Sequence, residues 1–192
     1  MTPVELPILA FESPDAWAIW LEEHHAVSKG VWLKLAKKGS GIASVTYAEA
    51  LEVALCHGWI DGQKRSHDAS AWLQKFTPRG KKSIWSKVNR DKALELIRSG
   101  RMQPAGLEEV ERAQRDGRWE AAYDSQSNAT VPSDLEEALD RSPKAKAFFA
   151  TLDSTNRYAI LFRLHTAKKV ETRARRLEQF IQMLERGEKI HN

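Results

Sequence analysis

The chain has 192 residues, of which 42% are hydrophobic and 29% are charged, with 30 Lys and Arg against 26 Asp and Glu. This length and apolar content suit one compact domain or two small ones, and they exclude a wholly disordered chain. A single cysteine excludes an internal disulfide framework and a Cys-rich zinc module. No apolar run approaches the roughly 18 residues of a spanning helix, and Met1–Ala10 lacks the basic start and apolar core of a signal peptide. We therefore expect a cytoplasmic protein without a transmembrane segment.

The first part of the chain predicts alternating strands and helices. Leu6–Phe11 is typical of a short strand, and Ser13-Pro14-Asp15 then supplies an N-cap, a proline for the first helical position and an acid for the first turn. Val31–Lys37 alternates apolar residues with others, as a half-buried strand does. Thr46-x-x-Glu49 is a capping box that opens a second helix, which Gly58 is placed to stop.

Two more strands and a helix follow. Trp59–His67 and Ala71–Thr77 predict strands joined by a tight turn, and either Ser83 or Ser86 can cap a helix that ends at Gly100. The order strand, helix, strand, helix, strand, strand, helix favours an α+β fold. In such a fold, helices cover a small antiparallel sheet.

The remainder is predicted to be helical. Asp124–Thr130 is polar and is the best linker. Ser133-x-x-Glu136 is another capping box, and Ser142-Pro143 starts a further helix. We therefore expect an α+β domain at residues 1–123 and a helical module at residues 130–187.

Basic residues are concentrated in one stretch. The segment from Gly62 to Arg101 holds eleven Lys and Arg against three acids, a net charge of +8, whereas the rest of the chain carries −4. Local positive charge of this kind can form an anion-binding surface. A solvated helix face whose partners come from the acidic remainder produces the same pattern.

Several strings of the sequence match one family pattern. They are Ala54–Gly62, Phe76–Arg79, Ser83–Asn89, Gly117–Trp119 with Ala122-Tyr123, Val131–Leu135, Ala167–Lys169, Glu171–Arg173 and Arg175-Arg176. In these strings the chain resembles the YdeI/OmpD-associated (OmdA, bacteriocin-protection) proteins of bacteria over nearly its whole length. The resemblance implies a YjbR/CyaY-like fold for the N-terminal part, followed by a helical C-terminal module.

What the family implies about function concerns envelope stress, resistance to cationic antimicrobial peptides and association with an outer-membrane porin. The family supplies no agreed catalytic residues. It is sometimes described as periplasmic, whereas this sequence shows no export signal, so we keep the cytoplasmic expectation.

The strongest candidate site is the stretch Phe76–Arg90. Its loop places guanidinium, ammonium and hydroxyl groups before a helix N-terminus, where unpaired N–H groups and the helix dipole favour phosphate or carboxylate. An arginine can hold an oxyanion through two parallel hydrogen bonds, and a tryptophan can stack on a base. The alternative is that the serine only caps the helix, the tryptophan is core and the lysines are solvated. The expected anion-binding residues are Arg79, Lys81, Lys82, Ser83, Trp85 and Asn89, extended by Arg173 and Arg176 of a second basic cluster.

A competing site lies at Cys56 and His57, beside Asp61. A nucleophilic cysteine needs a lowered pKa, a base within reach and an orienting group. Adjacent residues on a helix diverge by about 100°, so the imidazole need not face the thiol, and a packed cysteine is the commoner outcome. The histidines match no recognised metal spacing, so we expect no metal and no cofactor.

Three tryptophans add a question about exposed aromatic surface. Trp32, Trp72 and Trp85 fall on or near the strand face opposite the predicted core, or on the basic helix. An exposed ring there would be a stacking surface, although a second layer of helices, which the C-terminal module can supply, would bury it equally well.

These patterns favour a non-enzymatic, stress-associated binding protein of that family, with a basic surface for phosphate or nucleic acid. Two alternatives remain open. One is an enzyme of unknown reaction that uses Cys56, His57 and Asp61. The other is a protein-interaction module that works through the C-terminal helices.

Overall fold

The computed structural model describes residues 5–191. The start of Met1–Ala10, on which the expectation about an export signal rests, lies outside the described residues. The chain divides into two compact units, Met1–Ala122 and Tyr123–Asn192. None of the helices in the described part is both long and apolar enough to cross a membrane.

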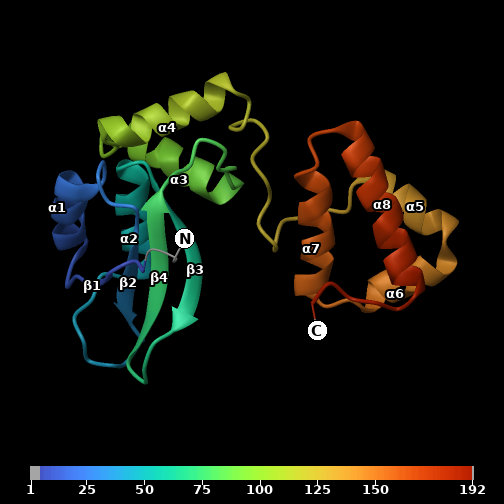
Figure 1. The fold of residues 1–192 in the computed structure, drawn as a ribbon, viewed down its shortest axis with the longest axis horizontal. Helices are drawn as coiled ribbons and strands as arrows, with labels where there is room; N and C mark the ends of the chain where they lie inside the picture. Colours follow the sequence, from blue (N-terminus) through green and yellow to red (C-terminus); the bar gives the residue numbers. More distant parts are fainter. Residues whose placement is uncertain (1–4, 192) are drawn as a thin grey trace. The chain divides into compact units, whose positions relative to one another are not determined.

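The N-terminal unit is α+β, as predicted (Figure 1). Its strands are β1 (Ile8–Ala10), β2 (Val31–Ala36), β3 (Trp59–Ser66) and β4 (Ala71–Pro78). Its helices are α1 (Pro14–His24), α2 (Tyr47–Cys56), α3 (Lys87–Arg98) and α4 (Pro104–Arg115).

The four strands form one sheet in the order β1-β2-β4-β3. Strand β4 pairs antiparallel with both β2 and β3, but β1 pairs parallel with β2. The sheet is therefore mixed, and the expectation of a purely antiparallel sheet is wrong at β1. The cause is the connection between these strands, because a helical crossover such as α1 returns the chain to the end of the sheet where it started.

Local capping explains where the helices of this unit begin. The side chain of Ser13 accepts a hydrogen bond from the backbone N–H three residues on, and Thr46 and Glu49 form the reciprocal capping box that the sequence predicts. Ser86 caps α3 in the same way. Of the two serines that the sequence left open, Ser83 therefore lies in the preceding loop.

The hydrophobic core of the unit lies between the sheet and its helices. Val31, Leu33 and Phe76 are fully buried there, beside Trp17, whose Nε1 donates to the carbonyl oxygen of Ala50 at 3.1 Å. One contiguous cluster joins the inward strand residues to side chains from all four helices. The helices thus cover the same face of the sheet. All seven tryptophans of the chain belong to this unit.

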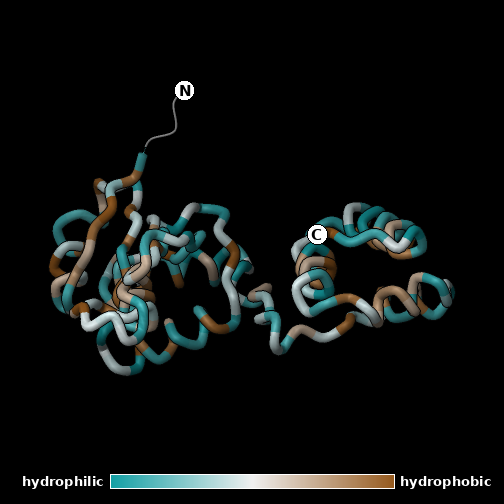
Figure 2. Tube along the Cα trace, turned by 90° about the horizontal axis from the view of Figure 1, so that it is seen from below, coloured by the Kyte–Doolittle hydropathy of each residue, from teal (hydrophilic) through white to brown (hydrophobic). Residues whose placement is uncertain are grey.

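The C-terminal unit is helical, and hydrophobic and hydrophilic residues alternate along its helices (Figure 2). Leu135, Ile160, Leu164 and Leu184 are fully buried and form the centre of its core. The helices are α5 (Ser133–Arg141), α6 (Pro143–Thr151), α7 (Ser154–His165) and α8 (Val170–Glu185).

The two helix starts predicted at serines in this unit behave differently. Ser142 caps α6 and also donates to Glu185 on α8 at 2.6 Å. The expected capping box at Ser133 is wrong, because Ser133 is already the first helical residue and makes no side-chain cap. The backbone N–H of Leu135 donates instead to the side chain of Asp134, at 2.9 Å.

Candidate functional site

The sheet has a second face that the helices of the N-terminal unit do not cover. Along β2, Trp32 and Lys34 alternate with the buried core residues and stay half-buried. Residues directly opposite one another on antiparallel strands share a face, so the pairings of β2 with β4 and of β4 with β3 extend this face across the sheet. We call it the outer face; its side chains are Ile8, Trp32, Lys34, Ile60, Arg65, Leu73, Lys75 and Thr77.

A long arginine crosses the outer face. The guanidinium of Arg65, on β3, lies 4.3 Å from the centre of the Trp32 ring, on β2. Strand β4 runs between those two strands, so the Arg65 side chain passes over it. Leu73, which is opposite Arg65 on β4, is only 1% exposed, although the four helices of this unit pack on the other face of the sheet. The cation–π contact therefore closes a small apolar patch and holds a cation at the surface.

The cations of the outer face differ in their partners. Lys34 lies 3.4 Å from a carboxylate oxygen of Asp68. Hydrogen bonds from Ser70 and the contact with Lys34 hold the pKa of Asp68 well below its usual range. Within residues 5–191, Arg65 and Lys75 have no carboxylate partner. Two cations of this face are thus available to an external anion.

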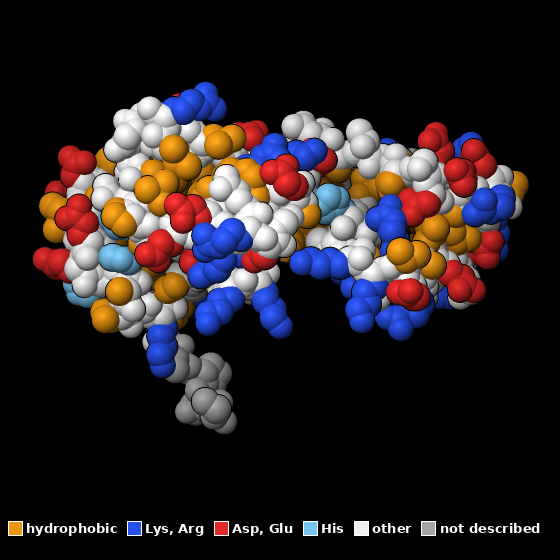
Figure 3. Space-filling view, turned by 90° about the horizontal axis from the view of Figure 1, so that it is seen from above, with side chains coloured by type: hydrophobic (Ala, Val, Ile, Leu, Met, Phe, Trp, Pro, Cys, Tyr) orange, Lys and Arg blue, Asp and Glu red, His pale blue; other side chains and the backbone are white. Residues whose placement is uncertain are grey.

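The loop that follows β4 adds exposed charge. Lys81 and Lys82 are exposed, and the Ser83 hydroxyl accepts from the N–H of Gly80 at 3.1 Å, which closes the loop on itself. On the side of the molecule drawn in Figure 3, several Lys and Arg side chains project from the lower edge of this unit, and others lie at its upper edge among Asp and Glu.

Arg79 is placed differently from its two lysine neighbours. It is 5% exposed, its guanidinium lies 3.6 Å from the centre of the Trp85 ring, and its Nη1 donates to the carbonyl oxygen of Ile84 at 3.2 Å. The buried Arg118 donates in the same manner to the carbonyl oxygen of Ser83 at 2.7 Å. Both arginines therefore hold the backbone of the loop. The sequence had shown Arg118 only as part of a family string.

The remaining aromatic and amide groups of the expected site are buried. Trp85 is 2% exposed and packs edge-on against Trp119, with ring centres 4.9 Å apart, and Asn89 is 8% exposed. Trp72 lies opposite the core residue Leu35 and faces the helices. Of the three tryptophans considered from the sequence, Trp32 is the one on the outer face.

Arg173 and Arg176 serve mainly to hold the C-terminal helices together. Arg173 bonds both carboxylate oxygens of Asp134, at 2.6 and 2.8 Å, and donates to the carbonyl oxygen of Leu164 at 2.7 Å. Arg176 donates to the carbonyl oxygen of Arg163 at 2.5 Å. The hydrogen bonds from Arg173 lower the pKa of Asp134.

The structure does not join the three residues of the competing site. Cys56 is 5% exposed, and burial raises the pKa of its thiol, which is the opposite of what a nucleophile needs. Asp61 accepts a hydrogen bond from the Tyr47 hydroxyl at 2.9 Å, and the Nδ1 of His57 lies 2.9 Å from the carbonyl oxygen of Val53. No group of three or more His, Cys, Asp or Glu able to hold a metal gathers anywhere in the described chain.

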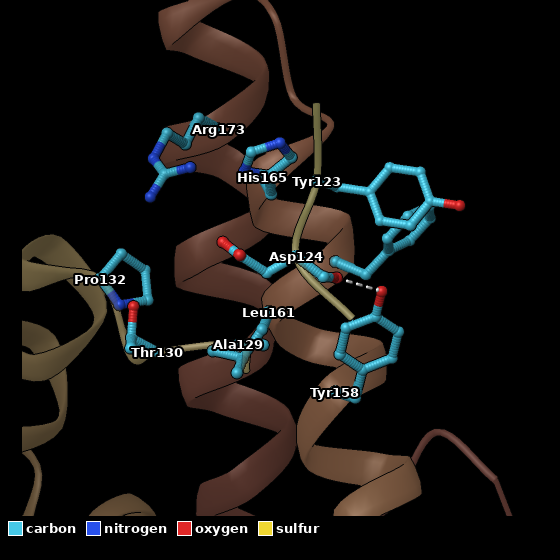
Figure 4. Close-up of a pocket in the computed structure, with 10 residues that line it drawn as sticks. Tyr123, Asp124, Ala129, Thr130, Pro132, Tyr158, Leu161, His165 and Arg173 are labelled. Carbon is cyan, nitrogen blue, oxygen red and sulfur yellow. Dashed lines mark hydrogen bonds between the residues drawn. The ribbon is translucent and has the colours of Figure 1, made fainter. Parts of the chain in front are cut away.

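The C-terminal unit contains a cavity of about 150 Å³ (Figure 4). The Tyr158 hydroxyl donates to the carbonyl oxygen of Asp124 at 2.8 Å beside it, and Tyr123 packs edge-on against Phe162. Arg173 reaches this cavity with a guanidinium already bonded to Asp134. A cavity of this size can hold a molecule as small as benzene and is below the usual volume of ligand pockets.

An α+β unit with an open basic sheet face, followed by a helical unit, is thus the class of protein that the structure defines. Residues 9–109, more than half of the chain, match the family described as "Domain of unknown function (DUF8412)", and the chain belongs to that family. Residues 128–187 match the family described as "Bacteriocin-protection, YdeI or OmpD-Associated" (OmdA), which supports the resemblance for the C-terminal unit. No curated protein matches the chain. No solved structure matches either, so the YjbR/CyaY-like expectation for the N-terminal part has no support.

Proposed function

We propose that this protein is a binding protein whose outer face takes up a polyanion, and that the polyanion is a single-stranded nucleic acid. The observation that carries the proposal is the Arg65 guanidinium over Trp32, next to Lys75, on the sheet face opposite the helices of the N-terminal unit. A flat sheet surface with aromatic and cationic groups suits extended single strands.

The contacts of these residues support a division of labour. Arg65 presents a planar cation on which a base can stack or to which a phosphate can bond. Lys75 supplies a point charge for the backbone. A substituent on Gly62 would lie 3.7 Å from the Lys75 side chain, so the β-bulge of β3 leaves room beside it. Lys81 and Lys82, exposed in the loop after β4, extend the positive field.

A single strand fits the outer face better than a duplex does. Reading the major groove requires a protruding helix or ribbon, whereas the outer face consists of the strands themselves. Splayed bases can reach a flat surface without such an element. The match to the bacteriocin-protection family supports placing this binding role in a stress-associated setting, and a cytoplasmic location would give access to nucleic acid.

The experiment is fluorescence anisotropy of a labelled oligothymidylate with the full chain, at several salt concentrations. The double variant Arg65→Ala/Lys75→Ala should weaken binding at every salt concentration. It should also lower the slope of log K against log salt by about 1.4, because each phosphate contact on a single strand contributes about 0.7.

The matched control is Arg98→Ala/Lys144→Ala, which removes the same two charges from exposed helical positions. This control should retain nearly all of the affinity and slope. Equal losses in the two double variants would reduce the effect to net charge, and tighter binding of the matching duplex would contradict the choice of a single strand. Absence of binding at low salt would leave the protein-interaction role of the C-terminal helices as the better account.

A further inference from the structure

Two histidines meet where two helices of the N-terminal unit end. His25 is the C-cap residue of α1, and His57 is the C-cap residue of α2. Their ring centres are 5.8 Å apart. The two helices are fixed against each other by the hydrogen bond from Trp17 to the Ala50 carbonyl, so the pair belongs to the rigid core of the unit.

Backbone contacts set the same tautomer in both rings. The Nδ1 of His25 lies 2.8 Å from the carbonyl oxygen of Leu21, and the Nδ1 of His57 lies 2.9 Å from that of Val53. A carbonyl oxygen can only accept, so each Nδ1 carries the proton and each neutral ring keeps its lone pair on Nε2. Metal-ligating histidines commonly make the same kind of contact, in which one ring nitrogen donates to a backbone carbonyl and the other binds the metal.

The Nε2 of His57 has no partner in the described chain. The residue is 5% exposed, and this nitrogen is fully buried without a hydrogen bond. A buried polar atom left unpaired is costly and calls for an explanation such as a bound ion. Burial lowers the pKa of His57, which favours the neutral form that a metal requires.

We propose that the Nε2 atoms of His25 and His57 bind a divalent transition-metal ion of the zinc, nickel or copper class. With metal–nitrogen bonds of about 2.0–2.1 Å, two imidazole rings on one ion have centres roughly 5–6.5 Å apart, which includes the separation found here. The C-terminal ends of two helices also bring their negative dipole ends to this point and favour a cation.

The chemistry of the two ligands selects among metals. Imidazole nitrogen suits zinc, copper and nickel, whereas magnesium and calcium prefer oxygen. Because no third His, Cys, Asp or Glu gathers with them in residues 5–191, water completes the coordination shell. The ion reaches the site from the side of His25, which is half-buried, and it joins the end of α1 to the end of α2.

The test uses the full chain, freed of metal, with Zn²⁺ as the only added ion. Titration calorimetry measures the binding of Zn²⁺, and the shift in the thermal midpoint of unfolding measures its effect on stability. Wild type should bind one Zn²⁺ and gain thermal stability. His25→Ala and His57→Gln should each weaken binding by more than about tenfold and lose the gain in stability. Mg²⁺ should have no effect on any variant.

His24→Ala is the matched control. His24 adjoins His25, and its Nδ1 also lies 2.8 Å from a backbone carbonyl, that of Trp20, but its ring stacks on Trp20 instead of facing His57. This variant should bind Zn²⁺ like wild type. The His25 side chain is only half-buried, so the His25→Ala variant should fold like wild type. The proposed site is refuted if this variant binds Zn²⁺ as tightly as wild type. Loss of binding in His24→Ala alone would move the metal to that residue.

Discussion

Arg65 is the residue on which the proposed binding surface depends. Its stem covers Leu73, and its charged end rests on the ring of Trp32. A lysine at the same position would keep the charge but would lack the planar guanidinium, which can stack on a ring and form two parallel hydrogen bonds. A cation–π contact at an exposed site contributes about 0.5–1 kcal/mol, and loss of the stem also uncovers Leu73, so the unfolding midpoint of the Arg65 variant is measured beside its binding.

Cys56 provides a test of the enzymatic alternative. Because the thiol is buried, a reagent can reach it only after part of the structure opens. We expect its modification by an aromatic disulfide reagent to be slower in the folded protein by roughly a hundredfold or more than in denaturant. The chain has one cysteine, so the absorbance change reports this residue alone. Reaction at the rate of a free thiol would instead place Cys56 in an accessible, reactive site.

At the scale of elements, Gly106 sets how closely α4 approaches α2. A Cβ on this residue would collide with the carbonyl oxygens of Leu55 and Cys56. The variant Gly106→Ala should therefore lower the free energy of unfolding by about 1–3 kcal/mol, the usual cost of overpacking. Urea unfolding followed by tryptophan fluorescence measures this change.

The control for this prediction is Gly62→Ala. An added Cβ there meets the Lys75 side chain at an ordinary contact distance of 3.7 Å. Its unfolding midpoint should stay close to that of wild type. A Gly106→Ala protein as stable as Gly62→Ala would show that α4 can move away from α2 at no cost.

The contact of α5 with α8 through Asp134 and Arg173 makes the C-terminal unit sensitive to acid. The folded pKa of Asp134 lies below its ordinary value of 3.8, so the pair stabilises the unit above that value and loses its effect as the pH falls through the folded pKa. The free energy of opening in α5 and α8, taken from hydrogen exchange after correction for the intrinsic rate at each pH, should therefore fall below about pH 4.

Asp134→Asn separates this pair from general acid effects. The variant should exchange faster than wild type at neutral pH, because Arg173 loses its charged partner, and the two proteins should converge in acid. A constant difference between them at all pH values would mean that the ion pair contributes nothing to the acid response.

Much of the secondary structure was predictable because its signals are local. The helix starts predicted at Ser13, Thr46 and Ser142 depend on neighbouring residues, and the structure confirms them, with each side chain accepting from the N–H three residues on. The parallel pairing of β1 was not predictable, since it depends on which strand lies next to β2. Ser133 failed as a cap because the helix already includes it as its first residue.

The candidate site was harder to predict, since burial is a property of the whole fold. Lys81 and Lys82 are exposed, in keeping with a charged loop, but Arg79 is sequestered by a tryptophan and a backbone carbonyl. The contact of Arg65 with Trp32 spans three strands and follows from the strand order. No local pattern connects those two residues.

At the scale of the whole molecule, the candidate sites and the family matches are divided between the two units. The open sheet face and the histidine pair both lie in Met1–Ala122, whereas the OmdA match and the small aromatic cavity lie in Tyr123–Asn192. Arg173 and Arg176 donate to carbonyl and carboxylate groups of their own unit. The variants of the outer face therefore change only the N-terminal unit. The C-terminal unit stays unaltered and serves as an internal reference for folding.

The confinement of all seven tryptophans to the N-terminal unit gives each unit its own optical signal. Indole emission follows the α+β unit alone, while the ellipticity of the peptide bonds follows the helices of both. If the unfolding curves measured by emission and by ellipticity do not coincide, the two units unfold as separate cooperative units. Ligand at the outer face would then shift the emission curve first, and a partner of the C-terminal unit would shift the ellipticity curve without changing the emission curve.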